Sequence, residues 1–154
     1  MSNTFSQIYI QIVFAVQNRQ HLIRPKHEEE LFKYMTGIVQ NKGHKLISIN
    51  GMPDHIHVFL GLKPNEAISD VVRDLKKDSS KLINSKNWVR GKFSWQEGYG
   101  GFSYGHSQIK DVARYIENQK IHHKKRSFKE EYIGLLNKFQ IDYEEKYLFK
   151  WIDY

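Results

Sequence analysis

Two histidines separated by one residue stand in an apolar segment of the chain. His55 and His57 belong to the stretch 55–62, and all of the remaining residues of that stretch are apolar or glycine. Alternate residues of a strand point to the same side, so both imidazoles could bind one ion at about 2.1 Å. The alternative is a pair of histidines on a half-exposed strand with no metal, because this spacing arises easily by chance. A stable metal site would need a third ligand from another element.

A tyrosine and a glutamine are spaced to share one side of a predicted helix. Tyr115 and Gln119 are four residues apart, which makes them neighbours on a helix surface. They lie beside the buried apolar stripe of the helix, and from this position their side chains could reach across a sheet surface. The stripe consists of Ile109, Val112, Ala113 and Ile116. The alternative is an ordinary amphipathic edge, where tyrosine and glutamine are common.

These residue types suit the cleavage of a phosphodiester. A tyrosine hydroxyl can attack phosphorus and form a covalent phosphotyrosine, provided that a cation neutralises the phosphate and helps the phenol to lose its proton. The chain has no cysteine, so any metal must be bound by nitrogen and oxygen. Neutral ligands would leave the charge of the ion available to the phosphate. Mg²⁺ or Mn²⁺ would serve this role, although imidazoles also suit zinc or nickel.

The apolar periodicity predicts the elements that would position these residues. Strands are expected at 8–16, 45–50 and 55–62, and a fourth within 93–104 together with a glycine loop or bulge. Helices are expected from Pro25 to Gly43, from between Asn65 and Ser69 past Leu82, from an N-cap at Ser107 to about Arg126, and over 128–139. The order β-α-β-β-α-β-α predicts an α+β ferredoxin-like sandwich, with an antiparallel sheet and helices.

Length and composition limit the classes of protein that the chain could be. Its 154 residues fit one domain, in which 1–126 would form the core and 127–154 a helical and aromatic tail packed on it. No apolar run is long enough to span a membrane, and the N-terminus lacks the layout of a secretory signal, so we expect a cytoplasmic protein. The net charge of +7 favours an anionic partner such as nucleic acid.

Two groups of basic residues are candidates for DNA binding. One lies on the second predicted helix, and the other lies at the end of the third, where cations also simply favour the helix dipole. The groups consist of Lys76, Lys77 and Lys81, and of Lys120, Lys124, Lys125 and Arg126.

Four motifs together resemble one known family. The segment 52–59, Met-Pro-Asp-His-Ile-His-Val-Phe, resembles the His-hydrophobic-His strand of the bacterial single-tyrosine transposases of the HUH nuclease superfamily. The segment 114–119, Arg-Tyr-Ile-Glu-Asn-Gln, resembles their nucleophile helix. The segments 95–99 and 76–80 resemble the aromatic-glycine stretch and the basic second helix. The likeness runs from about residue 5 to residue 119. It includes insertion-sequence transposases and their relatives tied to repeated extragenic palindromes.

The resemblance implies a function and a set of roles. Members of the family are homodimers that cut and rejoin single-stranded DNA at insertion-sequence ends, recognise hairpins and form 5′-phosphotyrosine intermediates. Their tyrosine helix often completes the partner subunit's metal site. Carried over, Tyr115 is the nucleophile, and His55, His57 and Gln119 are the metal ligands. A catalytically silent or domesticated hairpin-binding protein of this fold, and a replication initiator or relaxase, are the alternatives.

Overall fold

The computed structural model describes residues 4–145 and residue 148. Its centre is a four-stranded antiparallel sheet with the strand order β2-β3-β1-β4. This order is that of a ferredoxin-like sandwich, so the predicted α+β class is confirmed. The strands are β1 (Tyr9–Ala15), β2 (Lys45–Met52), β3 (His55–Gly61) and β4 (Gly100–Tyr104).

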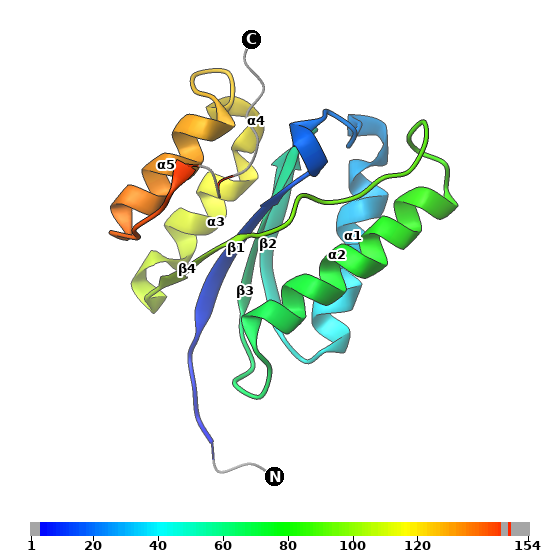
Figure 1. Cartoon of the computed structure of the whole chain (residues 1–154). Coiled ribbons are helices and arrows are strands. Elements are labelled where there is room, and N and C mark those ends of the chain that lie inside the picture. The colour runs from blue at the N-terminus through cyan, green and yellow to red at the C-terminus, as the bar shows by residue number, and fades with distance from the viewer. Residues whose placement is uncertain (1–3, 146–147, 149–154) are drawn as a thin grey trace.

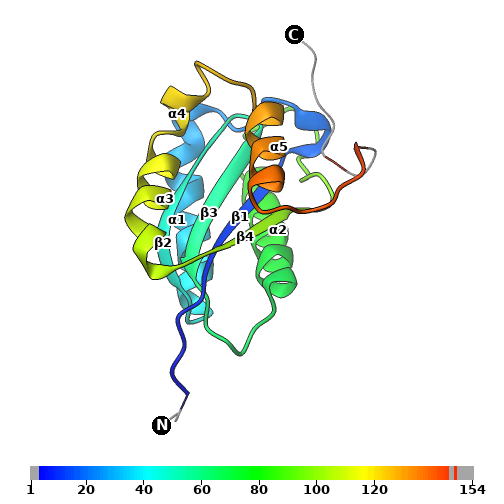
Figure 2. The same cartoon turned by 90° about the vertical axis from the view of Figure 1, so that its left-hand side faces the viewer.

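Helices cover both faces of the sheet (Figures 1 and 2). On one face lie α1 (Pro25–Asn41) and α2 (Ile68–Ser85), which pack against each other. On the other face lie α3 (Ile109–Glu117), the short α4 (Gln119–His122) and α5 (Phe128–Lys138). No helix in the described part of the chain has the length and hydropathy needed to cross a membrane.

The alternation of residues along the strands decides which side chains meet each helical layer. In β3, Ile56, Val58 and Leu60 join the core under α1 and α2. Phe59 faces the other way and packs with Val112 and Ile116 of α3. His55 and His57, in register with Phe59, therefore face the layer of α3 and α5.

The third predicted helix is broken, which the apolar periodicity did not indicate. A short 3-10 turn at His106–Gln108 precedes α3, and α3 ends at Glu117. Ser107 lies inside that turn, so the prediction that it caps the helix was wrong. Asn50 Nδ2 donates hydrogen bonds of 3.0 and 3.1 Å to the carbonyls of Ile116 and Glu117. In a continuous helix those carbonyls would accept hydrogen bonds from backbone N–H groups of the next turn. Asn50 supplies donors in their place and so stabilises the break before α4.

Two strand boundaries also differ from the prediction. The fourth strand is confined to Gly100–Tyr104, and the preceding aromatic stretch pairs with the chain after β1 through an isolated bridge between Val16 and Trp95. The second strand extends to Met52 rather than ending at Asn50. Gly51 therefore lies within β2, and the turn is limited to Pro53 and Asp54.

The C-terminal helix α5 packs on the sheet and is part of the described core. Phe128, Tyr132 and Leu136 form a cluster with residues of β1 and β4, comprising Val13, Ala15 and Phe102. The division of the chain at residue 126 remains a prediction. The aromatic end, Trp151 to Tyr154, lies outside the described residues.

Gly51 is required by the tight β2–β3 hairpin that carries the histidines. A Cβ at this position would lie 2.2 Å from the carbonyl oxygen of His55 and 3.0 Å from Cα of Ile56. We expect Gly51→Ala to lower the free energy of unfolding by about 1–3 kcal/mol, because the clash is with backbone. Urea denaturation measures this. Gly61→Ala in β3 is the control, since its nearest contact would be an ordinary 3.6 Å, and an equal loss in both variants would contradict the steric explanation.

Candidate active site

The two histidines of β3 are completely buried beneath α5. His55 and His57 both have 0% exposure, whereas the metal-free alternative considered from the sequence placed them on a half-exposed strand. The difference arises because Phe128 of α5 stacks on the His55 ring with the centroids 3.8 Å apart. Both histidines thus lie inside the protein, not on its surface.

A carboxylate and an arginine hold the His55 ring. The Nδ1 of His55 lies 2.7 Å from Asp54 Oδ1, and Arg19 Nε donates to Asp54 Oδ2 at 2.9 Å. With Nδ1–H donating to Asp54, the Nε2 of His55 faces the centre of the site. Carboxylate–histidine pairs of this kind fix the ring orientation and the tautomer of metal-binding histidines.

His57 is held by a chain of polar groups from the sheet. The amide Nε2 of Gln11 donates to His57 Nδ1 at 2.8 Å, and the hydroxyl of Tyr104 donates to Gln11 Oε1 at 2.7 Å. In this arrangement His57 Nε2–H donates to Glu131 at 3.0 Å. If the Gln11 amide turned over, its oxygen would accept from Nδ1–H and leave Nε2 of His57 with a free lone pair.

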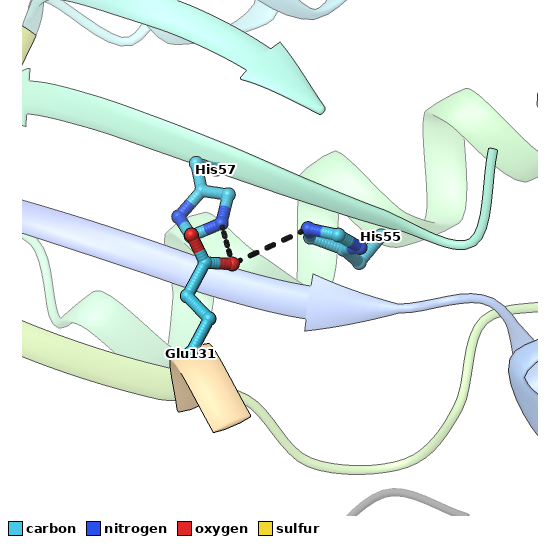
Figure 3. A group of neighbouring side chains, drawn as sticks. All are labelled: His55, His57 and Glu131. Atoms are coloured by element: carbon cyan, nitrogen blue, oxygen red, sulfur yellow. Dashed lines mark hydrogen bonds and ion pairs between the residues drawn. The ribbon is translucent and has the colours of Figure 1, made fainter. Parts of the chain in front are cut away.

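Glu131 of α5 is the central residue that the sequence analysis missed. It is 1% exposed, and its carboxylate lies within 3.5 Å of both strand histidines (Figure 3). It also accepts from His123 at 3.1 Å. A signal was present in the sequence, because Glu131 is three residues after Phe128 and four before Leu135, which places a charge on the buried face of a helix.

The structure brings the predicted helix residues to the same centre. Gln119 is 0% exposed, its Oε1 lies 3.3 Å from His55 Nε2, and its Nε2 donates to Glu131 Oε2 at 2.9 Å. The Tyr115 hydroxyl donates to the same Glu131 oxygen. Arg126 Nη2 in turn donates to the Tyr115 oxygen at 2.6 Å. All of these contacts form within one chain, and the catalytic and ligand roles of the residues remain predictions.

The donor set fits a divalent cation. His55, His57 and Glu131 can each offer one ligand atom, and these atoms lie within 4.8 Å of one another. Bonds of about 2.1 Å would place neighbouring ligand atoms about 3.0 to 3.4 Å apart, for angles between 90° and tetrahedral. The Nε2–Oε1 distances are 3.0 Å from His57 to Glu131, 3.5 Å from His55 to Glu131 and 3.3 Å from His55 to Gln119. With a carboxylate present, the site would carry one negative ligand that the sequence analysis did not include.

The electrostatics of the cluster follow from one buried carboxylate among imidazoles. Burial alone would raise the pKa of Glu131, but His57, His123 and His55 outweigh it and hold that pKa far below its usual range. Burial lowers the pKa of His57. Burial also opposes charge on His55, yet Asp54 and Glu131 together raise its pKa. Burial, and then the charge of Glu131, raise the pKa of the Tyr115 hydroxyl, so the phenol is neutral in this arrangement.

The predicted basic residues fall into four environments, of which three lie away from the groove described next. Lys76 Nζ donates to the carbonyls of Gln96 and Gly98, and burial lowers its pKa to about 8. Lys120 is bound to the hairpin at Gly51 and to Glu28. Lys77 and Lys81 are exposed on α2, on the far side of the sheet from Tyr115.

The remaining basic residues line a groove next to the buried histidines. Its volume is about 620 Å³. Lys124, Lys125 and Arg126 are joined there by further cationic side chains, namely Arg19 and Lys129. The groove also contains Asp54 and His123, which contact the histidine cluster directly. A single strand bound in it would place its phosphates beside the site.

Comparison with known proteins identifies the family. The family described as "Transposase IS200 like" matches residues 4–119. The chain belongs to the IS200-like transposase family. It is 25% identical over 120 residues to the ISDra2 transposase TnpA of Deinococcus radiodurans, an alignment that covers 73% of this chain and 84% of that protein.

Two solved structures have the same fold as this chain. A crystal structure of a candidate transposase from Deinococcus radiodurans R1 has a TM-score of 0.61 and 23% identity, and covers 77% of this chain and 95% of that one. The structure of a REP-associated tyrosine transposase bound to a REP hairpin has a TM-score of 0.59 and 14% identity. The match covers 80% of this chain and 74% of that one. The family match ends at Gln119, so Arg126 and Glu131 lie beyond it.

In this IS200-like family member, the Asp54 carboxylate is expected to orient His55 for metal binding, and a substitution can test this. We expect Asp54→Asn to weaken Mn²⁺ binding by about 10- to 100-fold, because the amide orients His55 less firmly and leaves Arg19 without its anion. Isothermal titration calorimetry of the folded variant measures the affinity. Asp142→Asn, at an exposed position, is the control. Unchanged affinity in Asp54→Asn would exclude a positioning role for this carboxylate.

Proposed function

We propose that the protein is a metal-dependent transposase that cleaves and rejoins single-stranded DNA at insertion-sequence ends through a 5′-phosphotyrosine intermediate. The supporting observation is that the Tyr115 hydroxyl, two buried histidines, Gln119 and Glu131 meet in one cluster. A protein that only binds DNA does not need a phenol in contact with a set of metal-binding groups. Family membership independently supports action on DNA.

In this proposal Tyr115 is the nucleophile, and its immediate partners orient the hydroxyl and stabilise its charge. The hydroxyl donates to Glu131, which orients the phenolic oxygen, and the nearby cations favour loss of its proton to solvent as that oxygen bonds to phosphorus. Arg126 faces the same oxygen and would stabilise negative charge on it. The bond from phosphorus to the 3′ oxygen breaks, leaving a free 3′ end and a 5′-phosphotyrosine. Rejoining is the same exchange in reverse, with a 3′ hydroxyl displacing the tyrosine.

The metal in this proposal is Mg²⁺ or Mn²⁺, bound by His55, His57, Gln119 and Glu131. A bound ion would neutralise the scissile phosphate and stabilise the leaving 3′ oxygen. His55 and His57 must present Nε2 as a lone pair, which Asp54 and a turned Gln11 amide both favour. The oxygen of Gln119 already points at His55 Nε2.

The DNA in this proposal is a single strand that carries a hairpin. The solved relative bound to a REP hairpin supports this choice of partner by likeness. The cationic groove formed by Lys124, Lys125 and Arg126 supplies a path for the backbone next to Tyr115. A homodimer is also proposed, on the basis of the family resemblance, and a partner could exchange the tyrosine helix that this chain places on its own site.

The nucleophile is tested by trapping the covalent intermediate. With hairpin-bearing single strands and Mg²⁺, we expect a protein–DNA adduct on a denaturing gel that falls to background in Tyr115→Phe, because only the hydroxyl is removed. Tyr34→Phe, at an exposed position of α1, is the control and should retain the adduct. An adduct that persists in Tyr115→Phe would contradict the assignment. Unmodified DNA with intact binding by the natural sequence would instead indicate a catalytically silent hairpin-binding protein.

A further inference from the structure

A cavity of about 340 Å³ opens beside the Tyr115 hydroxyl, between α3 and α5. Each helix presents one face to it. The residues on the α3 side are Gln108, Asp111, Val112 and Tyr115, and those on the α5 side are Glu131, Gly134, Leu135 and Lys138. Both sets have the spacing i, i+3, i+4, i+7 of a single helical face, so the cavity follows the length of the two helices.

We propose that this cavity binds the unstacked base of the nucleotide adjoining the scissile phosphate. The inference rests on the proposed function for the identity of its occupant. A tyrosine that attacks a phosphate must have the two neighbouring nucleotides within reach of its hydroxyl. Tyr115 lines the cavity together with Glu131 and Arg126, both of which contact its hydroxyl. The volume of the cavity is at the lower end of the ~300–1,000 Å³ range of small-molecule sites, which suits one nucleoside.

The chemistry of the walls favours a neutral, planar ring with a polar edge. Val112, Leu135 and the half-buried ring of Tyr104 provide apolar and aromatic surface. Exposed Gln108 and Asp111 provide polar groups at the rim, where the Asp111 carboxylate could accept from the amino groups of a base. The carboxylates of Asp111 and Glu131 are balanced in formal charge by Arg126 and Lys138, so the lining as a whole suits a neutral ring.

Cations lie where the phosphates of the same strand would be. Arg126 and Lys138 are exposed lining residues of the cavity, and Arg126 also lines the cationic groove. The groove and the cavity therefore meet at Arg126, next to Tyr115. A strand could run along the groove, pass the nucleophile and turn its next base into the cavity, as enzymes do when they take a base out of the stack.

Gly134 keeps the cavity open. It lies within α5 on the cavity-facing side, and a Cβ added there would meet no heavy atom within 4 Å. Glycine in a helix is unfavourable relative to alanine by roughly 0.5–1 kcal/mol, and neither a positive φ nor a close contact requires it here. A Cβ at this position would meet no existing atom, so we expect a larger side chain to occupy part of the cavity.

The test is a comparison of two glycine variants in nucleotide binding. The probes are the four deoxynucleoside 5′-monophosphates, titrated into ¹⁵N-labelled protein and followed by NMR. We expect saturable shifts at residues around Val112 and Leu135, and a loss of affinity of about tenfold or more in Gly134→Leu, given the usual contribution of base stacking. Gly37→Leu in α1 is the matched control, because a Cβ there also meets nothing within 4 Å and α1 covers the opposite face.

A second variant and a strand assay complete the test. Asp111→Trp blocks the cavity from α3, and it replaces Gly134→Leu if that variant does not fold. On a cleavable strand, an abasic site at one position next to the cleaved phosphate should slow cleavage by about tenfold in the natural sequence and have no further effect in Gly134→Leu. Equal nucleotide binding in the natural sequence and in the blocked variants, or no saturable binding in the natural sequence, would overturn the proposal.

The outcomes separate this inference from the proposed function. If the natural sequence binds nucleotides in the cavity but forms no covalent adduct with any hairpin-bearing strand, the cavity stands and the transposase mechanism fails. If the adduct forms at the same rate in Gly134→Leu and in the natural sequence, the mechanism stands and the cavity proposal fails.

Discussion

The burial of one carboxylate, that of Glu131, constrains the rest of the site. A buried charge is unfavourable unless it is paired and hydrogen-bonded. Glu131 is 1% exposed, and it meets this requirement by contacting His57, His123, Gln119 and the Tyr115 hydroxyl. Removing any of these partners would leave polar groups of the others unsatisfied, so the cluster behaves as a unit.

Apolar packing holds this carboxylate in place. Phe128 and Tyr132 flank Glu131 on α5 and lie in the core cluster of that face. Phe128 also stacks on His55, and the Arg19 guanidinium lies 4.6 Å from the centre of the Phe128 ring. The same helix face therefore covers the histidines and delivers their anionic partner. A displacement of α5 would expose the histidines and withdraw the carboxylate in one movement.

The position of Gln119 depends on a break in the helix rather than on its regularity. A glutamine four residues after a tyrosine in one continuous helix would lie beside that tyrosine at the helix edge. Here α3 ends at Glu117, and Gln119 begins α4 with its side chain completely buried against His55. Asn50 of β2 stabilises the break through the carbonyls of Ile116 and Glu117. The hairpin that carries the histidines thus also positions the helix that meets them.

The sequence predicted the features that depend on local periodicity. The apolar alternation in β1 and β3 and the order of the elements led to the confirmed α+β fold. The features that it missed depend on contacts between distant residues. The helix break depends on Asn50, which is 66 residues from Ile116, and the inclusion of Glu131 depends on where α5 docks. A charge on the apolar face of α5 was the one local sign of that docking.

We infer that His55, His57, Gln119 and Glu131 surround one divalent cation beside Tyr115. Pulsed electron paramagnetic resonance of the Mn²⁺-loaded protein, prepared with ¹⁵N-histidine, detects the nitrogen ligands of the ion. We expect hyperfine coupling of the ion to two histidine nitrogens, which is lost when both strand histidines are replaced by alanine. A Mn²⁺ ion coupled only to water protons, with no histidine nitrogen in its coordination sphere, would contradict it.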